Sequence, residues 1–390
     1  MNSDNSDIVL LSTADWDNPF WTNKQHVAIE LARRGHRVLY VDSLGLRRPS
    51  VSARDLGRIL RRILRGIAPP RCVRPQLWVW SPLVVPLQRF ALVRRLNRLT
   101  LSWGLRLWCR ALRIRRDVLW TYNPMTTGLF PTADFRTVVY HCVDEIRAQP
   151  GMPARAIDAA EADLLARADV CFVTAEHLLE TRRRVNPNTF YFPNVADFEH
   201  FAAARDPATT VPDDLARLPR PRIGFVGAIS GYKLDLALIR AIADAHPEWS
   251  VVLIGQVGEG DPWTDVAMLQ GPPNLHLLGP RPYATLPAYL KGFDTAMLPA
   301  AQNDYTRGMF PMKFFEYLAA GCPVVGTTLP ALKAYTDIAL LTASPAAFIE
   351  AIETTLAGNG AALERRLEAA REHTYERRTT RMMQLLESHQ

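Results

Sequence analysis

The sequence has few cysteines and no long apolar run. Its 390 residues include five cysteines, at positions 72, 109, 142, 171 and 322, without any paired short spacing. This spacing favours free buried thiols over disulfides or a zinc site. No apolar stretch approaches the roughly 20 residues of a membrane-spanning helix, and the polar, acidic first residues lack the features of a signal peptide. We therefore expect a protein that stays in the cytoplasm.

Negative charge is nearly missing from one region. Residues 46–116 hold eighteen arginines, no lysine and one acid, Asp55, whereas the whole chain has a net charge of +7. Within residues 52–67, six aliphatic residues fall on one helical face and five arginines on the other. Such a helix suits the headgroup layer of an anionic membrane, where each arginine is worth about 1 kcal/mol. We expect peripheral membrane docking there; the alternatives are packing on its own domain or, less favoured, a nucleic-acid contact.

A second arginine-rich stretch, residues 87–116, has apolar residues on two helical faces. One stripe consists of Leu92, Leu96, Leu99, Trp103 and Leu107, and the other of Leu101, Leu105, Trp108 and Leu112. A helix that is apolar on two faces is expected to be buried between other elements, or to meet a membrane or a partner. The sequence leaves these alternatives open.

The length and the alternation of elements indicate two α/β domains. A chain of 390 residues exceeds the usual size of one hydrophobic core. Strand-like and helical segments alternate throughout, which predicts doubly wound parallel sheets. We place a linker in the proline-bearing stretch 194–221. The first domain would comprise residues 1–203 and the second residues 217–362, followed by a last helix within residues 363–390.

One segment combines a short helix, a glycine turn and a buried strand. Residues 310–327 read Phe-Pro-Met-Lys-Phe-Phe-Glu-Tyr-Leu-Ala-Ala-Gly-Cys-Pro-Val-Val-Gly-Thr. Pro311 suits the first turn of a helix, Gly321 suits the left-handed residue that follows its end, and the two valines suit a strand covered on both faces. Lys313 and Glu316 share one helical face at a sheet edge, where ligands bind in such folds. They predict a site for a phosphate and a hydroxyl-rich group, or else a surface ion pair.

Several blocks along nearly the whole chain resemble, in order, those of the GT-B glycosyltransferases of group 1, family 4-like, a type found in teichuronic acid or exopolysaccharide synthesis. The blocks are residues 8–42, 169–174, 193–201, 222–227, 250–255, 274–279, 310–327 and 370–378. The resemblance implies a GT-B fold, in which two Rossmann-like domains face each other across a cleft and a closing helix crosses back to the first domain. It also implies a hexosyltransferase that moves a sugar from a nucleotide-sugar to a saccharide or lipid-linked acceptor in cell-surface polysaccharide or glycolipid synthesis.

The resemblance assigns donor binding to the second domain. The matching residues are Gly227, Ser230, Lys233, Tyr283, Lys313 and Glu316. The glutamate would hold the donor ribose, the two lysines would neutralise the diphosphate, and the glycine and serine belong to the family's pyrophosphate loop. The tyrosine follows the strand where the family reads the nucleobase, and it either stacks on the base or packs beneath the following helix.

One position departs from the family pattern. Many retaining members carry a second acid eight residues before the ribose glutamate, and here that position is Gly308. Arg307, Asn303 or nearby backbone groups would hold the sugar or phosphate instead, unless they are plain loop. The stereochemical outcome of transfer is therefore left open.

Candidate catalytic and acceptor residues lie at or just after the carboxyl ends of strands in the first domain. His141 resembles the family position near the transferred sugar. Asp144 would orient this histidine or act as a base on the acceptor hydroxyl, whereas the alternative is a histidine that caps the following helix. Asn123, after another strand, would line the same cleft.

The loop after the first strand is aromatic and acidic where the family has glycines. It contains Asp15, Trp16 and Asp17. Such a loop suits a carbohydrate or polyol, with the tryptophan as a stacking platform and either aspartate as a candidate base. Because this Asp-x-Asp pair lies in the acceptor domain, we expect no donor metal, and no cofactor beside a UDP- or GDP-sugar.

Two other functions are considered. A nucleotide-sugar epimerase of the same fold would need several acids and histidines in the cleft. An inactive GT-B-like binding or scaffold subunit would fit Gly308 and the unusual first loop. Retention of Lys233, Lys313 and Glu316 together favours an active donor site.

Overall fold

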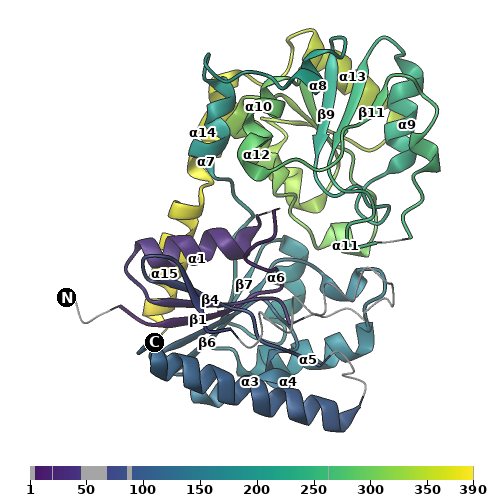
Figure 1. Cartoon of the computed structure of the whole chain (residues 1–390). Helices are drawn as coiled ribbons and strands as arrows, with labels where there is room; N and C mark the ends of the chain where they lie inside the picture. Colours follow the sequence, from purple (N-terminus) through teal and green to yellow (C-terminus); the bar gives the residue numbers. More distant parts are fainter. Residues whose placement is uncertain (1–4, 20, 45–67, 86–89, 262, 390) are drawn as a thin grey trace.

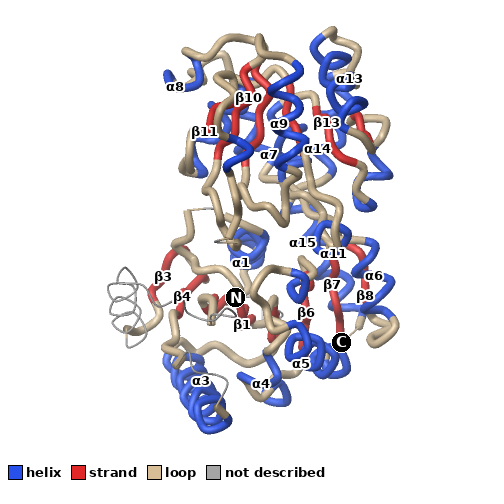
Figure 2. Tube along the Cα trace, turned by 90° about the vertical axis from the view of Figure 1, so that its right-hand side faces the viewer, coloured by secondary structure: helices blue, strands red, loops and turns tan. Residues whose placement is uncertain are grey.

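The computed structural model describes residues 5–19, 21–44, 68–85, 90–261 and 263–389. The helix predicted within residues 52–67 therefore lies outside the described residues. The described chain forms two parallel α/β units, one above the other in Figure 1. Both Figure 1 and Figure 2 show α1 (Asn23–Arg33) at the end of the first unit that faces the second.

The first sheet has eight strands in the order β3-β4-β2-β1-β5-β6-β7-β8. The strands are β1 (Ile8–Leu11), β2 (Val38–Val41), β3 (Arg71–Arg74), β4 (Leu77–Trp80), β5 (Val118–Thr121), β6 (Thr137–Cys142), β7 (Val170–Val173) and β8 (Thr189–Tyr191). All neighbours are parallel except β3 and β4. Strands β1, β2, β5, β6 and β7 are buried along their whole length, as expected for apolar strands covered on both faces.

Helices cover both faces of this sheet. One face packs against α1 and α15 (Tyr375–Ser388), and the other against α3 (Ala91–Ala111) and α5 (Ala154–Arg167). The shorter helices α4 (Thr126–Leu129) and α6 (Glu176–Arg183) lie beside α3, α5 and β8. Among the described residues, no helix is long and apolar enough to cross a membrane. All five cysteines are free, as predicted, but Cys72 is exposed rather than buried.

The second sheet has six parallel strands in the order β11-β10-β9-β12-β13-β14. The strands are β9 (Arg222–Val226), β10 (Ser250–Ile254), β11 (Leu275–Leu277), β12 (Thr295–Leu298), β13 (Val324–Thr327) and β14 (Leu340–Thr342). One face packs against α9 (Leu236–Ala245) and α13 (Pro345–Leu356). The other packs against α7 (Phe198–Ala202), α10 (Leu286–Lys291), α12 (Lys313–Ala320) and α14 (Leu363–Glu372). The short helices α8 (Asp213–Ala216) and α11 (Asp304–Arg307) complete this unit.

The last segment is two helices rather than the single helix predicted from the sequence. Helix α14 packs on α12 of the second unit, whereas α15 packs on α1 of the first (Figure 1, yellow). The break comes at His373 and Thr374, where the Thr374 hydroxyl caps α15 and the His373 carbonyl accepts the N–H of Ala196 at 3.0 Å. A continuous helix would not leave that carbonyl free to bond the linker. The domain limits at residues 203 and 217 stay a prediction.

Candidate functional site

Three neighbouring strands of the second sheet are followed by glycines. Gly227 follows β9, Gly255 follows β10 and Gly279 comes just after β11. The N–H of Gly227 donates to the carbonyl of Ile254 at 2.9 Å, and that of Gly255 to the carbonyl of Gly279 at 3.1 Å. A Cβ on Gly255 would lie only 1.7 Å from the Gly227 carbonyl oxygen, so this position accepts no side chain. Bare backbone therefore lines the carboxyl edge of the sheet, as phosphate-binding turns require.

The loop after β9 carries Ser230 and Lys233. Ser230 is fully buried, and its hydroxyl donates to the carbonyl of Glu259 at 2.5 Å, so it ties two loops together. The N–H of Lys233 donates to the Ser230 carbonyl at 2.9 Å, and its ammonium lies 5.4 Å from the centre of the Tyr232 ring. The Asn303 amide donates to the Tyr232 carbonyl at 2.8 Å. Lys233 thus adds a positive charge to a loop that hydrogen bonds from Ser230 and Asn303 fix to neighbouring segments.

Lys313 and Glu316 form a short ion pair in the first turn of α12. Lys313 Nζ lies 2.6 Å from Glu316 Oε2, with 22% of the lysine side chain and 4% of the glutamate side chain exposed. Burial raises the pKa of Glu316, and the positive charge of Lys313 opposes this shift. The pair is therefore mostly buried, rather than the surface ion pair of the alternative interpretation. Gly321 ends the helix at φ = 87°, as predicted from the sequence.

A chain of buried polar groups fixes the approach to α12. Arg378 of α15 donates to Asn23 Oδ1 at 2.8 Å, Asn23 donates to Asn194 Oδ1 at 2.6 Å, and Asn194 donates to the Phe310 carbonyl at 2.6 Å. These residues come from α15, α1, the linker and the segment before α12. The chain therefore sets the orientation of the donor-side helix relative to the first unit. Sequence reasoning missed Asn23, because its partners are distant along the chain.

Asp144 lies where the two units meet. It follows β6, is half-buried, and accepts a hydrogen bond at 3.2 Å from the Tyr305 hydroxyl of α11. Burial raises the pKa of Asp144, and Lys24 and then Lys233 oppose the shift. Burial lowers the pKa of Lys24, which Asp144 opposes and Lys233 reinforces. The predicted residues Asp144 and Lys233 therefore lie close to Lys24 and Tyr305. Sequence reasoning missed Lys24 and Tyr305, because only the fold brings the start of α1 and helix α11 next to Asp144.

His141 lies near the carboxyl end of β6, as predicted, but it is buried in the sheet rather than open to the cleft. It has no exposed surface, and its ring stacks on Tyr122 at 4.7 Å and contacts Trp120 and Phe172. Neither ring nitrogen has a hydrogen-bond partner among the described residues. Asp144 therefore does not orient this ring through a hydrogen bond, and the histidine does not cap the following helix. Burial lowers the pKa of His141 well below its usual value, which keeps the ring neutral. The strand continues through Cys142, and this continuation holds His141 within the sheet.

Trp16 is buried and does not offer an open stacking face. Its ring contacts Trp21 at 5.8 Å and the edge of Tyr40 at 5.2 Å between centroids. The backbone N–H of Trp16 donates a hydrogen bond to Asp42 Oδ1 at 2.8 Å. The aromatic loop predicted as a carbohydrate platform is therefore folded onto β2 in this structure.

The other candidates of the first unit differ in exposure. Asp15 is exposed, and Asp17 pairs with Arg71 of β3 at 2.5 Å. Asn123 is buried, and its Oδ1 accepts the N–H of Met125 at 2.9 Å, which forms a local turn. Of these three residues, Asp15 and Asp17 reach solvent.

Tyr283 packs within the protein in this structure. Its ring stacks on His200 at 4.3 Å with an interplanar angle of 10°, and it also lies parallel to Trp21 at 6.1 Å. His200 Nε2 lies 3.0 Å from the Tyr283 carbonyl oxygen. Burial raises the pKa of Tyr283 far above its usual value. The Tyr283 ring is thus packed between His200 of α7 and Trp21 of the first unit. In this structure it packs within the protein, near the place where a base was predicted to stack.

The loop around the missing second acid contacts the first unit. Arg307 is exposed and pairs with Asp304 at 3.3 Å. A Cβ on Gly308 would lie 2.9 Å from the Cβ of Glu145 and 3.3 Å from Leu178. Close packing between the units therefore accounts for glycine at this position.

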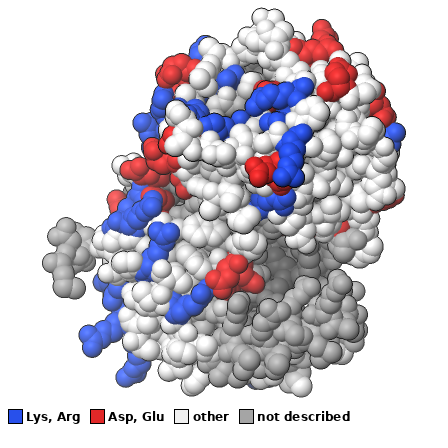
Figure 3. Space-filling view, turned by 45° about the horizontal axis from the view of Figure 1, so that its top comes forward, with Lys and Arg blue, Asp and Glu red and all other residues white. Residues whose placement is uncertain are grey.

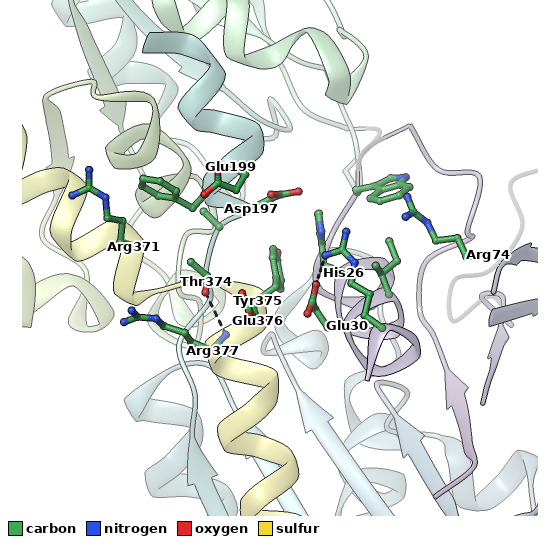
Figure 4. A pocket seen from close by; sticks show the side chains of 15 residues that line it. His26, Glu30, Arg74, Asp197, Glu199, Arg371, Thr374, Tyr375, Glu376 and Arg377 are labelled. Carbon is green, nitrogen blue, oxygen red and sulfur yellow. Dashed lines mark hydrogen bonds and ion pairs between the residues drawn. The ribbon is translucent and has the colours of Figure 1, made fainter. Parts of the chain in front are cut away.

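A pocket of about 380 Å³ opens at the seam, next to these residues. Figure 4 shows it between α1, the linker and the start of α15, with His26 and Tyr375 among its walls. None of the predicted site residues lines it. Asp197 in its wall faces the donor side: burial raises the pKa of Glu316, and the negative charge of Asp197 adds to that shift. The His26 ring stacks on Tyr375 at 4.2 Å, and burial lowers the pKa of His26 to about 3.

Comparison with known sequences places the second unit in a family. Residues 220–358 match the model described as glycosyl transferases group 1. The chain is 32% identical over 266 residues to TuaH of Bacillus subtilis (strain 168), named as a teichuronic acid biosynthesis glycosyltransferase. The alignment takes in 63% of this chain and 65% of TuaH, so this chain spans just under two thirds of that relative.

Solved structures share the whole fold. Sucrose-phosphate synthase (tll1590) from Thermosynechococcus elongatus has a TM-score of 0.67 at 17% identity, over 98% of this chain and 99% of that one. Anabaena Alr3699/HepE, in complex with UDP and glucose, has a TM-score of 0.64 at 15% identity, over 98% and 100% of the chains. WaaG, a glycosyltransferase involved in lipopolysaccharide biosynthesis, has 0.61 at 13%, over 96% and 98%. The fold is therefore GT-B, as predicted, and within it residues 220–358 match the glycosyl transferases group 1 family.

Proposed function

We propose that this chain transfers a sugar from a nucleotide-sugar to a saccharide or lipid-linked acceptor in cell-surface polysaccharide or glycolipid synthesis. The observation that carries the proposal is the mostly buried Lys313–Glu316 pair at the start of α12. It lies at the same edge of the second sheet as the glycines after β9, β10 and β11, where parallel α/β sheets bind their ligands. A buried carboxylate beside a bare backbone edge suits a ribose and a diphosphate.

In this proposal the second domain holds the donor. Glu316 accepts hydrogen bonds from the ribose hydroxyls. Lys233 and Lys313 neutralise the negative charge that develops on the leaving diphosphate, which favours cleavage of its bond to the sugar. UDP is the first donor nucleotide to test, because HepE, which shares the fold, was solved in complex with UDP and glucose.

The first domain supplies the acceptor side. Asp144 is the candidate base, because burial raises its pKa and so strengthens its hold on a proton taken from the acceptor hydroxyl. Tyr305 donates to this carboxylate from the second domain, so the base is fully positioned only when the two domains meet. The positive charge of Lys24 partly offsets the negative charge of the Asp144 carboxylate. Closure excludes the water that would hydrolyse the donor.

Three finer points complete the proposal. Transfer needs no bound metal or cofactor, because the two lysines supply the positive charge. The enzyme works in the cytoplasm, at the inner face of the plasma membrane. Residues 52–67 contribute to docking on anionic lipid through their arginines.

The test compares two glutamates of the second domain. Glu316→Ala should weaken binding of the cognate nucleoside diphosphate by at least tenfold, whereas Glu350→Ala, an exposed residue of α13, should not. UDP, GDP, TDP and CMP are first screened by thermal shift, since a ligand of the folded state raises the melting temperature. Affinity is then measured by calorimetry. Equal affinity of both variants would refute the donor site.

Turnover separates the alternatives. A glycosyltransferase joins the donor sugar to an added acceptor, an epimerase interconverts free nucleotide-sugars, and a scaffold subunit binds nucleotide without turnover. Transfer should continue at the full rate in EDTA. Activity that is lost on chelation and restored by Mg²⁺ or Mn²⁺ would contradict the metal-independent mechanism.

A further inference from the structure

Helix α3 presents a row of large apolar side chains to solvent. Leu101, Leu105 and Cys109 on its inner face are buried against the first sheet. The outer stripe, which we define as Leu92, Leu96, Leu99, Trp103 and Leu107, has exposed fractions from 40% at Leu107 to 78% at Leu92. The fold thus uses one of the two stripes seen in the sequence for packing and leaves the other uncovered. A contiguous apolar surface of this kind marks an interaction site.

Positive charge surrounds the outer stripe. The exposed arginines of α3 are Arg94, Arg95, Arg98, Arg106 and Arg110. Helix α3 contains no acid, and the sequence has none between Asp55 and Asp117. Asp134, outside the helix, pairs with Arg106 at 2.9 Å and with Arg116 at 2.7 Å. A partner for this face therefore needs an apolar layer that carries negative charge on its surface.

The position of α3 leaves the space between the domains free. Figure 1 shows the helix along the foot of the first domain, remote from the second domain. In Figure 3, basic side chains predominate along the lower left of the described surface, whereas acidic and basic groups mix over the upper part. A surface that meets α3 from below would not hinder the contact between Tyr305 and Asp144.

We propose that the outer stripe of α3 docks the protein on an anionic lipid bilayer. The leucines and Trp103 enter the boundary between headgroups and acyl chains, and the arginines beside them bind lipid phosphates. A second copy of the chain is a poorer occupant, because a two-fold contact through α3 would place arginines opposite arginines without an intervening acid on either helix. The outer stripe and residues 52–67 are different segments of the sequence.

The test compares matched triple variants in vesicle co-sedimentation. Leu96→Ser, Leu99→Ser and Trp103→Ser are combined to disrupt the outer stripe. The control combines Trp263→Ser, Met268→Ser and Leu363→Ser, which are exposed apolar residues of the second domain. With phosphatidylglycerol and phosphatidylcholine vesicles, the wild type and the control should bind alike, and the stripe variant at least tenfold more weakly. Binding should fall with rising salt and on pure phosphatidylcholine, because the attraction is partly electrostatic.

Three results would overturn the proposal. One is equal vesicle binding by the stripe variant and the wild type, which would place any docking elsewhere, for example in residues 52–67. Another is a dimer in light scattering that the stripe variant dissociates, which would make a second copy the occupant. The third is a melting temperature that falls by several degrees in the stripe variant alone, which would show that these side chains are packed against their own chain.

Discussion

Replacing Arg182 with methionine should destabilise the first domain strongly. Arg182 of α6 is buried, and its guanidinium donates to both carboxylate oxygens of Glu145 at 2.7 and 2.8 Å and to Glu161 at 2.9 Å. Both glutamates are also buried. One guanidinium therefore compensates two carboxylates in the interior.

The expected cost follows from this geometry. Removing one partner of a buried ion pair costs about 3–5 kcal/mol, because an uncompensated charge stays behind. Here two carboxylates stay behind, so we expect a loss near the upper end, about 5 kcal/mol in the free energy of unfolding. For a domain of this size each kcal/mol lowers the melting temperature by roughly 2–4 °C, so the melting temperature should fall by about 10–20 °C.

Urea and thermal unfolding, followed by the transition of the first domain, measure the loss. Arg184→Met is the matched control, because Arg184 is exposed and its replacement should change stability by no more than about 0.5 kcal/mol. Adding Glu145→Gln and Glu161→Gln to the Arg182 variant should restore much of the stability, since no like charges then face each other.

A loss below about 1 kcal/mol for Arg182→Met, or no recovery of stability when Glu145→Gln and Glu161→Gln are added, would refute this reasoning. The outcome also bears on the site. Glu145 directly follows Asp144, so the ion pair with Arg182 holds the segment that carries the candidate base. Loss of the pair should therefore lower the transfer rate even at temperatures where the variant stays folded.

Two further predictions concern the seam between the domains. Gly308→Ala should lower the transfer rate at saturating donor by about tenfold, because the added methyl would lie 2.9 Å from the Cβ of Glu145 and would hold the domains apart. Gly128→Ala, whose methyl would meet no atom within 4 Å, is the control, and equal rates in both variants would contradict the argument. His26→Phe should make the protein more resistant to acid. Burial lowers the pKa of His26 to about 3, so the wild type loses stability as the pH falls below 6.5, by about 2 kcal/mol at pH 5. Identical curves of melting temperature against pH for the variant and the wild type would rule this out.

Much of the fold and of the donor side follows from local sequence. The alternation of apolar strands and amphipathic helices predicts the two parallel sheets, because both patterns depend on residues that are close along the chain. For the same reason the helix with Lys313 and Glu316, its end at Gly321 and the strand after it agree with the structure. The arginine-rich composition around α3 is likewise a property of the sequence alone.

Tertiary structure alone decided the rest. The sequence showed two apolar stripes on α3 but not which one the sheet covers, since the covering strands lie elsewhere in the chain. It suggested open sites at Trp16 and His141, yet packing against distant aromatic rings buries both. Lys24 and Tyr305 gave no local signal, because they join Asp144 only after the two domains meet. Periodicity reports which residues share a face of an element, whereas burial, pairing and the position of a charge depend on what the fold places against that face.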